Sequence, residues 1–227
     1  MASGGQLIVV VGLAFEARIA AGPGIHVICS GNGGDLASAL TRACQEGGRS
    51  VISFGVAGGL DPELRPGTCV VGSAILSGET RMETHSGWSQ RLLDTIPGAV
   101  HGVIAGVPAP IAHPDAKRAI YLKTGAMAVD MESHIVAGVA AAHALPMAAI
   151  RVITDPAARA LPAAALAAMG PNGATDIGAM LRSVLRRPRE VPALFRTALD
   201  ARAARATLLR GRQLLGPSLG HPELQEA

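Results

Sequence analysis

The hydrophobic residues of this chain fall into continuous runs separated by glycine-rich or polar turns. The first run, residues 6–13, is rich in β-branched residues, and later runs cover residues 25–30, 50–56 and 68–76. Continuous apolar runs are typical of parallel strands that are buried on both faces. Between the second and third runs, residues 35–45 are predicted to form a helix that ends at a pair of glycines. The pattern therefore predicts an α/β fold with a mostly parallel sheet.

A strand, a helix and a second strand are predicted between residues 124 and 155. Met131 and Glu132 fall where the helix begins, and Asp155 falls where the second strand ends. In open parallel α/β sheets, ligands bind at the carboxyl ends of the strands and at the helix starts that follow them. Both acids are therefore candidate site residues.

The helix that begins at Glu132 carries a predicted core-facing stripe of Ile135, Val139 and Ala142. Glu132 lies one turn before this stripe, so its side chain is predicted to point inward. A buried carboxylate needs a partner or a ligand, and the helix N-terminus favours its ionised form, which can accept hydrogen bonds from two adjacent hydroxyl groups. The alternative, a first-turn glutamate that stabilises its helix from the solvent side, stays open.

Length and composition favour one cytoplasmic α/β domain without a metal centre. The chain has 227 residues, of which 49% are apolar. Its three cysteines form no Cys-x-x-Cys pair, which favours a reducing compartment. No basic residue precedes the first apolar run, and no run reaches the roughly 18 residues of a membrane span. The histidines show no metal-ligand spacing, and neither a serine-hydrolase nor a zinc-protease motif occurs, so no metal or organic cofactor is expected.

Two short motifs resemble the signature of the nucleoside phosphorylase and nucleosidase superfamily, which includes the methylthioadenosine/adenosylhomocysteine nucleosidases. They are Ala-Val-Asp-Met-Glu-Ser at residues 128–133 and Arg-Val-Ile-Thr-Asp at residues 151–155. The resemblance implies that Met131 and Glu132 bind the ribose and that Asp155 protonates the leaving purine. It also implies a three-layer domain with a mostly parallel mixed sheet flanked by helices, which is the nucleoside phosphorylase fold.

Glu16 lies just past the carboxyl end of the first predicted strand, on the presumed ligand side. In the hydrolytic branch of the superfamily an acid at the matching place activates water. Phosphorolytic members resembling the bacterial purine enzymes carry a basic residue there to hold phosphate. The resemblance therefore makes Glu16 a second catalytic candidate.

Two glycine-rich turns are candidates for the loop around the nucleophile. Gly31 and Gly33 follow the second strand, where backbone N–H groups can bind an anion. A dinucleotide site is disfavoured there because the third glycine of that fingerprint is missing, and a tight turn without a ligand stays open. The turn after the third strand, with Val56 and Gly58, resembles the superfamily's nucleophile and sugar loop. Ser53 and Val56 stand where phosphorylases place an arginine and a small hydroxyl residue, so two side-chain phosphate ligands are missing.

Aromatic residues make up only 2% of the chain, so each is a scarce candidate for stacking on a base. They are Phe15, Phe54, Trp88, Tyr121 and Phe195. Residues 77–89 are predicted to form a polar loop over the active-site face. His85 and Trp88 lie in this loop, where a surface role is favoured over substrate contact.

The chain after Asp155 is different in character. Nine arginines and two acids lie between residues 182 and 212, so nine minus two gives a local excess of seven positive charges. The arginines alternate with leucines, which predicts a basic amphipathic helix. We assign residues 1–187 to the nucleoside phosphorylase-like domain and residues 188–227 to a basic helical extension. A terminal helix packed on the domain is favoured, followed by a membrane-surface helix, and a nucleic-acid patch is disfavoured because interleaved aromatics are absent.

This extension, with the start Gly-Leu-Ala-Phe-Glu-Ala at residues 12–17 and the Val-Asp-Met-Glu-Ser core, is similar to the hopanoid-associated phosphorylases. That subfamily acts on adenosylhopane in hopanoid biosynthesis. The resemblance implies a nucleoside whose ribose carries a hopane at its 5' carbon, and peripheral contact with the inner face of the membrane. A homo-oligomer is also expected.

We therefore expect an enzyme that cleaves the N-glycosidic bond of an adenosine-type nucleoside and releases adenine. Asp155 would hold the proton for the purine, because apolar surroundings raise the pKa of a carboxyl group. Water is favoured as the nucleophile, because Glu16, Ser53 and Val56 resemble a water site. The alternative is phosphorolysis, with inorganic phosphate as co-substrate and a sugar 1-phosphate as product. A non-catalytic nucleoside-binding or membrane-associated scaffold of the same fold is a third interpretation, against which Asp155 argues.

Overall fold

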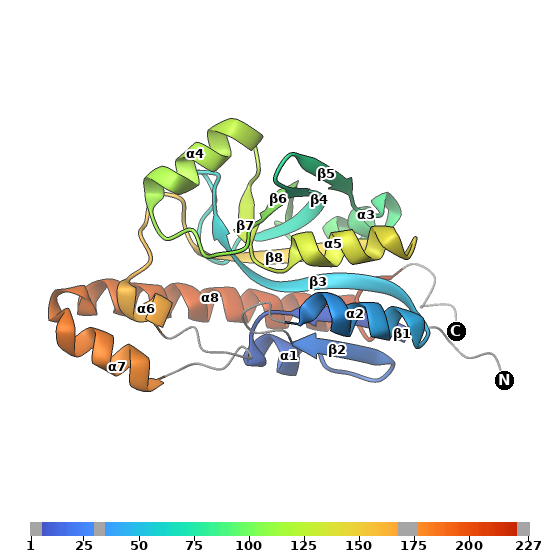
Figure 1. The fold of residues 1–227 in the computed structure, drawn as a ribbon, viewed down its shortest axis with the longest axis horizontal. Helices are drawn as coiled ribbons and strands as arrows, with labels where there is room; N and C mark the ends of the chain where they lie inside the picture. Colours follow the sequence, from blue (N-terminus) through green and yellow to red (C-terminus); the bar gives the residue numbers. More distant parts are fainter. Residues whose placement is uncertain (1–5, 30–34, 168–176, 222–227) are drawn as a thin grey trace.

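Eight strands form one mixed sheet in the computed structural model, which describes residues 6–29, 35–167 and 177–221 (Figure 1). They are β1 (Gln6–Val11), β2 (Ile25–Cys29), β3 (Gly48–Gly59), β4 (Cys69–Ser77), β5 (Thr80–Glu83), β6 (Val100–Gly106), β7 (Ala128–Asp130) and β8 (Met147–Asp155). Strands β2, β1, β3 and β8 run parallel to one another. Strand β3 also pairs with β7 at its last residues, so the path β3, β8, β4, β6, β7 closes on itself. The structure confirms the predicted α/β fold with a mostly parallel mixed sheet.

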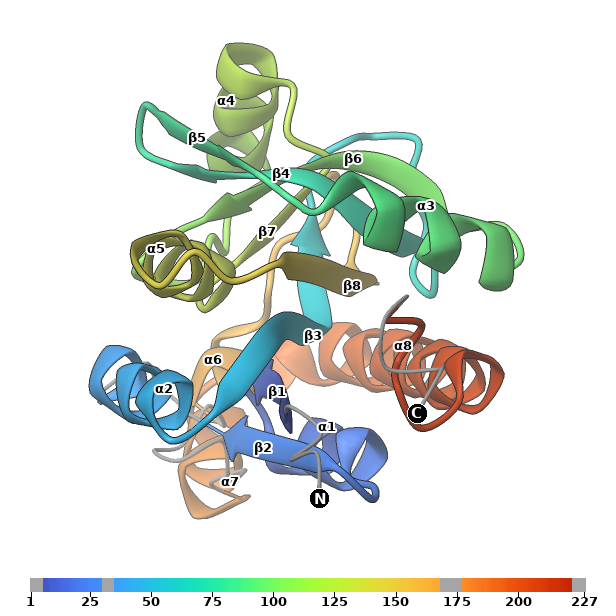
Figure 2. The same cartoon turned by 90° about the vertical axis from the view of Figure 1, so that its right-hand side faces the viewer.

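Helices cover both faces of the sheet (Figure 2). They are α1 (Ala14–Ala20), α2 (Leu36–Gln45), α3 (Ser86–Thr95), α4 (Pro114–Thr124), α5 (Ser133–Ala142), α6 (Ala163–Ala167), α7 (Ile177–Arg186), the 3-10 helix η2 (Pro188–Glu190) and α8 (Val191–Leu215). Helices α2 and α5 pack on one side of β1 and β3, whereas α1, α3 and α8 pack on the other. Helix α4 covers a smaller apolar cluster beside β6 and β7.

Strand β1 shows why the first apolar run is continuous. Leu7, Val9 and Val11 point into the core under α1, α3 and α8. Ile8 and Val10 point into the core under α2 and α5. All five side chains are buried, so both faces of this parallel strand require apolar residues.

The prediction that residues 77–89 form a polar loop is wrong. The chain forms β5, which pairs antiparallel with β4, and then begins α3, where the His85 ring accepts a hydrogen bond from the backbone N–H of Trp88. The Trp88 side chain is fully buried, its indole N–H donates to the carbonyl oxygen of Leu219, and its ring meets the ring of His221 edge-on. Trp88 therefore belongs to the core between α3 and the end of the chain.

The end of the chain contributes to the same core. Helix α8 buries Ala204, Leu208 and Leu215 against the sheet, while its first half extends beyond the sheet beside α6 and α7 (Figure 1). Within the described residues, no helix is both long and apolar enough to cross a membrane.

Candidate active site

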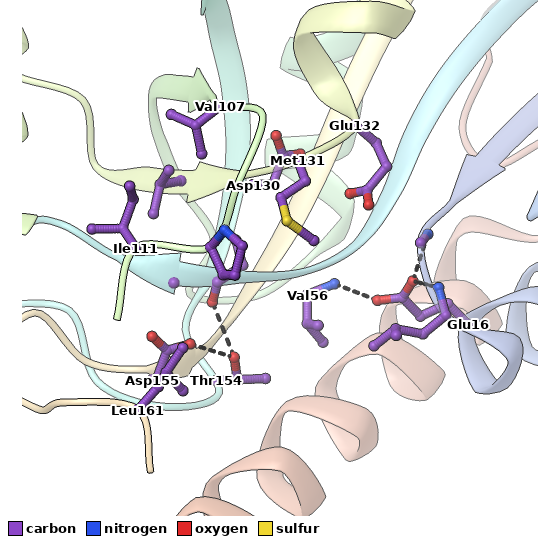
Figure 3. Close-up of a pocket in the computed structure, with 16 residues that line it drawn as sticks. Glu16, Val56, Val107, Ile111, Asp130, Met131, Glu132, Thr154, Asp155 and Leu161 are labelled. Carbon is purple, nitrogen blue, oxygen red and sulfur yellow. Dashed lines mark hydrogen bonds between the residues drawn. The ribbon is translucent and has the colours of Figure 1, made fainter. Parts of the chain in front are cut away.

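One pocket lies at the edge of the sheet where β1, β3, β7 and β8 end (Figure 3). It is lined by Gly12, Leu13, Glu16, Val56, Ala57, Gly58, Val107, Pro110, Ile111, Val129, Asp130, Met131, Glu132, Thr154, Asp155 and Leu161. Strands β1, β3 and β8 are parallel, so their carboxyl ends bring residues far apart in the sequence together there, and the short strand β7 joins them antiparallel to β3. The pocket collects six of the eight site residues expected from the sequence, while Gly31 and Gly33 lie outside the described residues.

Glu16 is held in the first turn of α1 by three backbone amides. Its Oε2 accepts from the N–H groups of Gly12 at 3.0 Å and Leu13 at 2.8 Å, and its Oε1 accepts from Val56 N–H at 2.7 Å. Burial raises the pKa of this carboxyl group, whereas Arg151 and the three amides oppose that rise. The expected residue Val56 thus lies at the Glu16 end of the pocket.

Glu132 is buried as predicted, but not because it continues the expected stripe of α5. The helix begins after Glu132, which is its N-cap residue, and the buried face consists of Ser133, Val136, Ala137 and Ala140. Ile135 and Val139 are only half-buried and Ala142 is exposed, so the stripe was predicted out of phase.

The Glu132 carboxyl group lies against Gly12 and Arg151. A Cβ atom at Gly12 would lie 2.7 Å from Glu132 Oε1, so a larger residue there would displace the Glu132 carboxyl group. Burial raises the pKa of Glu132 to about 7, and Arg151, whose Nη2 is 3.6 Å from Oε2, opposes the rise. The first N–H group of α5, that of Ser133, donates to Asp130, and the Glu132 side chain makes no capping hydrogen bond to the helix.

Arg151 is a buried cation behind this end of the pocket. Its Nε is paired with Asp130, and its Nη2 donates to the hydroxyl oxygens of Ser53 at 2.6 Å and Ser133 at 3.2 Å. The guanidinium group is thus bound on several sides by the protein. Ser53, where phosphorylases were expected to place an arginine, instead accepts a hydrogen bond from an arginine of β8.

Asp155 ends β8 at the opposite end of the pocket from Glu16 (Figure 3). Its Oδ1 accepts from the Thr154 hydroxyl at 2.9 Å, and its Oδ2 accepts from Lys117 Nζ at 2.6 Å. A Cβ atom at Gly58 would lie 3.1 Å from Oδ2, so the expected residue Gly58 adjoins Asp155 rather than Glu16. Burial raises the pKa of Asp155, and the charge of Lys117 opposes the rise.

The space between the two acidic ends is walled by aliphatic side chains. They are Leu13, Val56, Val107, Pro110, Ile111, Val129, Met131 and Leu161, and Figure 3 shows Met131 extending toward the middle of the pocket. None of the five aromatic residues is among the residues that line the pocket. Any planar ligand would therefore lie against aliphatic side chains.

Sequence reasoning missed three functional candidates, namely Asp130, Arg151 and Lys117. Asp130 and Arg151 stand inside the two motifs, and a polar side chain within an apolar strand was the signal for both. Lys117 lies on a helix that carries many exposed polar residues, so nothing in the pattern distinguished it. Among the described residues, no group of three or more His, Cys, Asp or Glu side chains is arranged to hold a metal ion.

Solved structures with similar folds include the native futalosine hydrolase of Helicobacter pylori, with 15% identity, a TM-score of 0.63, and coverage of 92% of this chain and 97% of that chain. The 5'-methylthioadenosine/S-adenosylhomocysteine nucleosidase of Streptococcus pneumoniae, solved with a transition-state inhibitor, gives 13% identity, a TM-score of 0.63 and coverage of 92% and 99%. The Helicobacter pylori nucleosidase of the same name has 18% identity and a TM-score of 0.60, and the match covers 68% of this chain and 87% of that chain. At these identities the comparisons show a similar fold and nothing more specific.

The family comparison gives a more specific result. No curated protein sequence matches the chain. The family model described as the phosphorylase superfamily matches residues 9–186, which contain both motifs and all the pocket residues. The chain therefore belongs to the phosphorylase superfamily, and the protein is an enzyme of the nucleosidase and nucleoside phosphorylase class.

Proposed function

We propose that this enzyme cleaves the N-glycosidic bond of an adenosine-type nucleoside and releases adenine. The observation that supports this most strongly is the arrangement of one pocket with two acidic ends, Glu16 and Glu132 at one and Asp155 at the other, and aliphatic walls between them. A nucleoside has matching chemistry. Its ribose hydroxyl groups need acceptors, its flat base needs apolar walls, and its base needs a proton donor as it leaves.

At the sugar end, ionised Glu132 accepts hydrogen bonds from the ribose hydroxyl groups. Glycosidic cleavage develops positive charge on the ribose, and preorganised negative charge lowers the energy of that transition state. Three carboxyl groups, those of Glu16, Asp130 and Glu132, act on the single guanidinium of Arg151. With all three ionised, the protein places a net negative charge beside the sugar.

At the base end, Asp155 gives its proton to N7 of the purine as the glycosidic bond breaks. A general acid must hold a proton at the working pH, and burial raises the pKa of Asp155 in that direction. Val107, Ile111 and Leu161 contact the faces of the base in this proposal. Asp155 also argues against a scaffold without chemistry, because binding alone does not require a proton donor.

The nucleophile in this proposal is water, activated by Glu16. A phosphate ion would meet the carboxylates of Glu16 and Glu132, and two like charges about 4 Å apart repel by about 1 to 4 kcal/mol at effective dielectric constants of about 80 to 20. The nearest cation, Arg151, is already bound by Asp130, Ser53 and Ser133. Phosphorolysis to a sugar 1-phosphate is the competing outcome.

We also propose that the 5' substituent is apolar, as in adenosylhopane. The segments around the pocket, residues 107–112 and 156–167, contain one charged residue, Arg159, which is paired with Asp200 of α8. The neighbouring helices α7 and α8 expose arginines and also Leu185, Phe195 and Leu199. An apolar surface beside exposed arginines suits a bilayer with anionic lipid, which would present a lipid-linked nucleoside.

Product analysis with several nucleosides tests this proposal. The protein is incubated with adenosylhopane, 5'-methylthioadenosine and adenosine, in buffer with and without phosphate, and base and sugar are identified by mass. The proposal expects adenine and a free sugar, with the largest kcat/KM for the lipid-linked nucleoside. Release only in the presence of phosphate overturns the water assignment, and a preference for adenosine overturns the apolar substituent.

A further inference from the structure

The chain has two lysines, and both lie on α4. Lys123 is exposed, as is usual for lysine, whereas Lys117 is fully buried. A buried ammonium group is costly unless oxygen atoms surround it, so its partners indicate what it does.

Four oxygen atoms surround Lys117 Nζ, and all belong to the end of β8 and the turn after it. They are Asp155 Oδ2 at 2.6 Å and the carbonyl oxygens of Pro156 at 3.1 Å, Arg159 at 3.2 Å and Asp155 at 3.4 Å. An ammonium group has three protons to share among these acceptors. The three carbonyl groups accept hydrogen bonds from the lysine and connect the turn at residues 156–159 to α4.

A second contact joins the same two parts of the chain. The backbone N–H of Leu161 donates to the carbonyl oxygen of Ala112 at 2.9 Å, next to the start of α4. Leu161 and Ile111 both line the pocket. Lys117 is therefore placed to fix the acid and the aliphatic wall above it as one unit.

We infer that Lys117 is the positioning residue of Asp155: it holds the carboxyl group in place through its Oδ2 and controls when that group takes up a proton. This inference rests on the proposed function, in which Asp155 is the general acid. Other charged groups do not share the task. Arg159 on the adjoining turn is paired with Asp200 of α8, and Glu16 and Glu132 lie on α1 and before α5 at the opposite end of the pocket.

The inference gives a pH signature that a purely structural lysine would not produce. A general acid works while protonated, so the rate falls as the pH rises through its pKa. The charge of Lys117 lowers the pKa of Asp155 against the effect of burial. When Lys117 is replaced by methionine, the pKa of Asp155 rises, and the alkaline limb of the kcat/KM profile moves to higher pH.

The test measures adenine release against pH for the wild type, Lys117→Met and Lys117→Arg, with the exposed Lys123→Met as the matched control. We expect Lys117→Met to lower kcat by about 10²-fold through misplacement of the acid and to shift the alkaline limb upward. Lys117→Arg, which keeps the charge, should leave the limb near its wild-type position, and Lys123→Met should match the wild type. If Lys117→Met does not fold, Lys117→Gln removes the charge while keeping a hydrogen-bond donor and is expected to give the same upward shift.

Two outcomes overturn the inference. In the first, Lys117→Met and Lys117→Gln keep the wild-type kcat and the wild-type position of the alkaline limb. In the second, the Met and Arg variants lose kcat equally with no movement of the limb, which shows a structural role only. A wild-type protein that releases no base from any nucleoside contradicts the proposed function instead, so the two failures are distinguishable.

Discussion

Three of the four acids that line the pocket, Glu16, Glu132 and Asp155, have similar side chains but different surroundings. Glu16 accepts from three backbone amides, Glu132 faces a guanidinium group at 3.6 Å, and Asp155 is paired with an ammonium group at 2.6 Å. Hydrogen bonds and opposite charges favour the ionised form of a carboxyl group, whereas burial favours the protonated form. In the proposed function, these distinct surroundings accompany distinct roles in one reaction, namely activating water, binding ribose and donating a proton.

The first prediction at this scale concerns Asp155. Asp155→Asn removes the proton donor and keeps the shape, so base release should fall by about 10²- to 10⁴-fold while nucleoside binding changes little. Turnover of adenosine-type nucleosides and binding by calorimetry measure the two effects. Asp200→Asn is the control, because that acid lies outside the pocket and pairs with Arg159. An Asp155→Asn enzyme within a few-fold of the wild type would rule out the acid role.

Glu132 supports a prediction about pH. Its pKa of about 7 means that the carboxyl group becomes protonated as the pH falls below 7. Since ribose hydroxyl groups donate to the ionised form, kcat/KM should fall as the pH decreases through about 7. In Glu132→Gln this acid limb should disappear and kcat/KM should be low at every pH. A profile whose acid limb survives the substitution would assign the limb to another group.

At the scale of elements, the sequence predicts strands better than it predicts what covers them. Apolar runs located β1, β2, β3, β4 and β8 to within a few residues, because a strand buried on both faces leaves a continuous signal. The short strand β5 and the start of α3 were missed, because their residues are largely polar and their place depends on pairing with β4. The two motifs predicted Met131, Glu132 and Asp155 as site residues, but Lys117 was not predictable, since only the tertiary fold brings it to Asp155.

Strand β3 gives a prediction about close packing behind the pocket. A Cβ atom at Gly55 would lie 2.5 Å from Glu16 Oε1 and 2.7 Å from Arg151 Nη1. Gly55→Ala should therefore displace Glu16, lower base release and destabilise the fold by about 1 to 3 kcal/mol, as is typical of overpacking. Gly138→Ala on α5 is the control, because a Cβ atom there meets open space. Chemical denaturation compares the two variants, and equal stabilities would contradict the packing argument.

At the scale of the whole molecule, the chain belongs to the phosphorylase superfamily over residues 9–186, and α8 follows. The second half of α8 is part of the core, so deleting residues 188–227 would remove core side chains such as Leu208 and Leu215 along with the arginines. The boundary at residue 187 between domain and extension therefore remains a proposal that rests on the change in composition along the sequence. The homo-oligomer and the cytoplasmic location also remain predictions. Sedimentation velocity would measure the oligomeric state.

Substitution of exposed arginines tests membrane contact without disturbing the core. Arg196→Gln with Arg202→Gln on α8 should weaken sedimentation with anionic liposomes, by about 1 kcal/mol per arginine that reaches the surface. The matched control is Arg42→Gln with Arg49→Gln, two exposed arginines on α2 and β3. Moderate salt should weaken binding of the unaltered protein, because the attraction is screened. Equal binding by both double variants would exclude α8 as the contact surface.

The central claim is hydrolysis of an adenosine-type nucleoside in a pocket with two acidic ends, and one measurement tests it most directly. An adenosine-type nucleoside is incubated with the enzyme in phosphate-free buffer containing H₂¹⁸O, and the sugar product is analysed by mass. The account predicts release of adenine, ¹⁸O at the anomeric carbon of a free sugar, and strong slowing in Glu16→Gln. An absolute requirement for phosphate, with a sugar 1-phosphate as the first product, would contradict it.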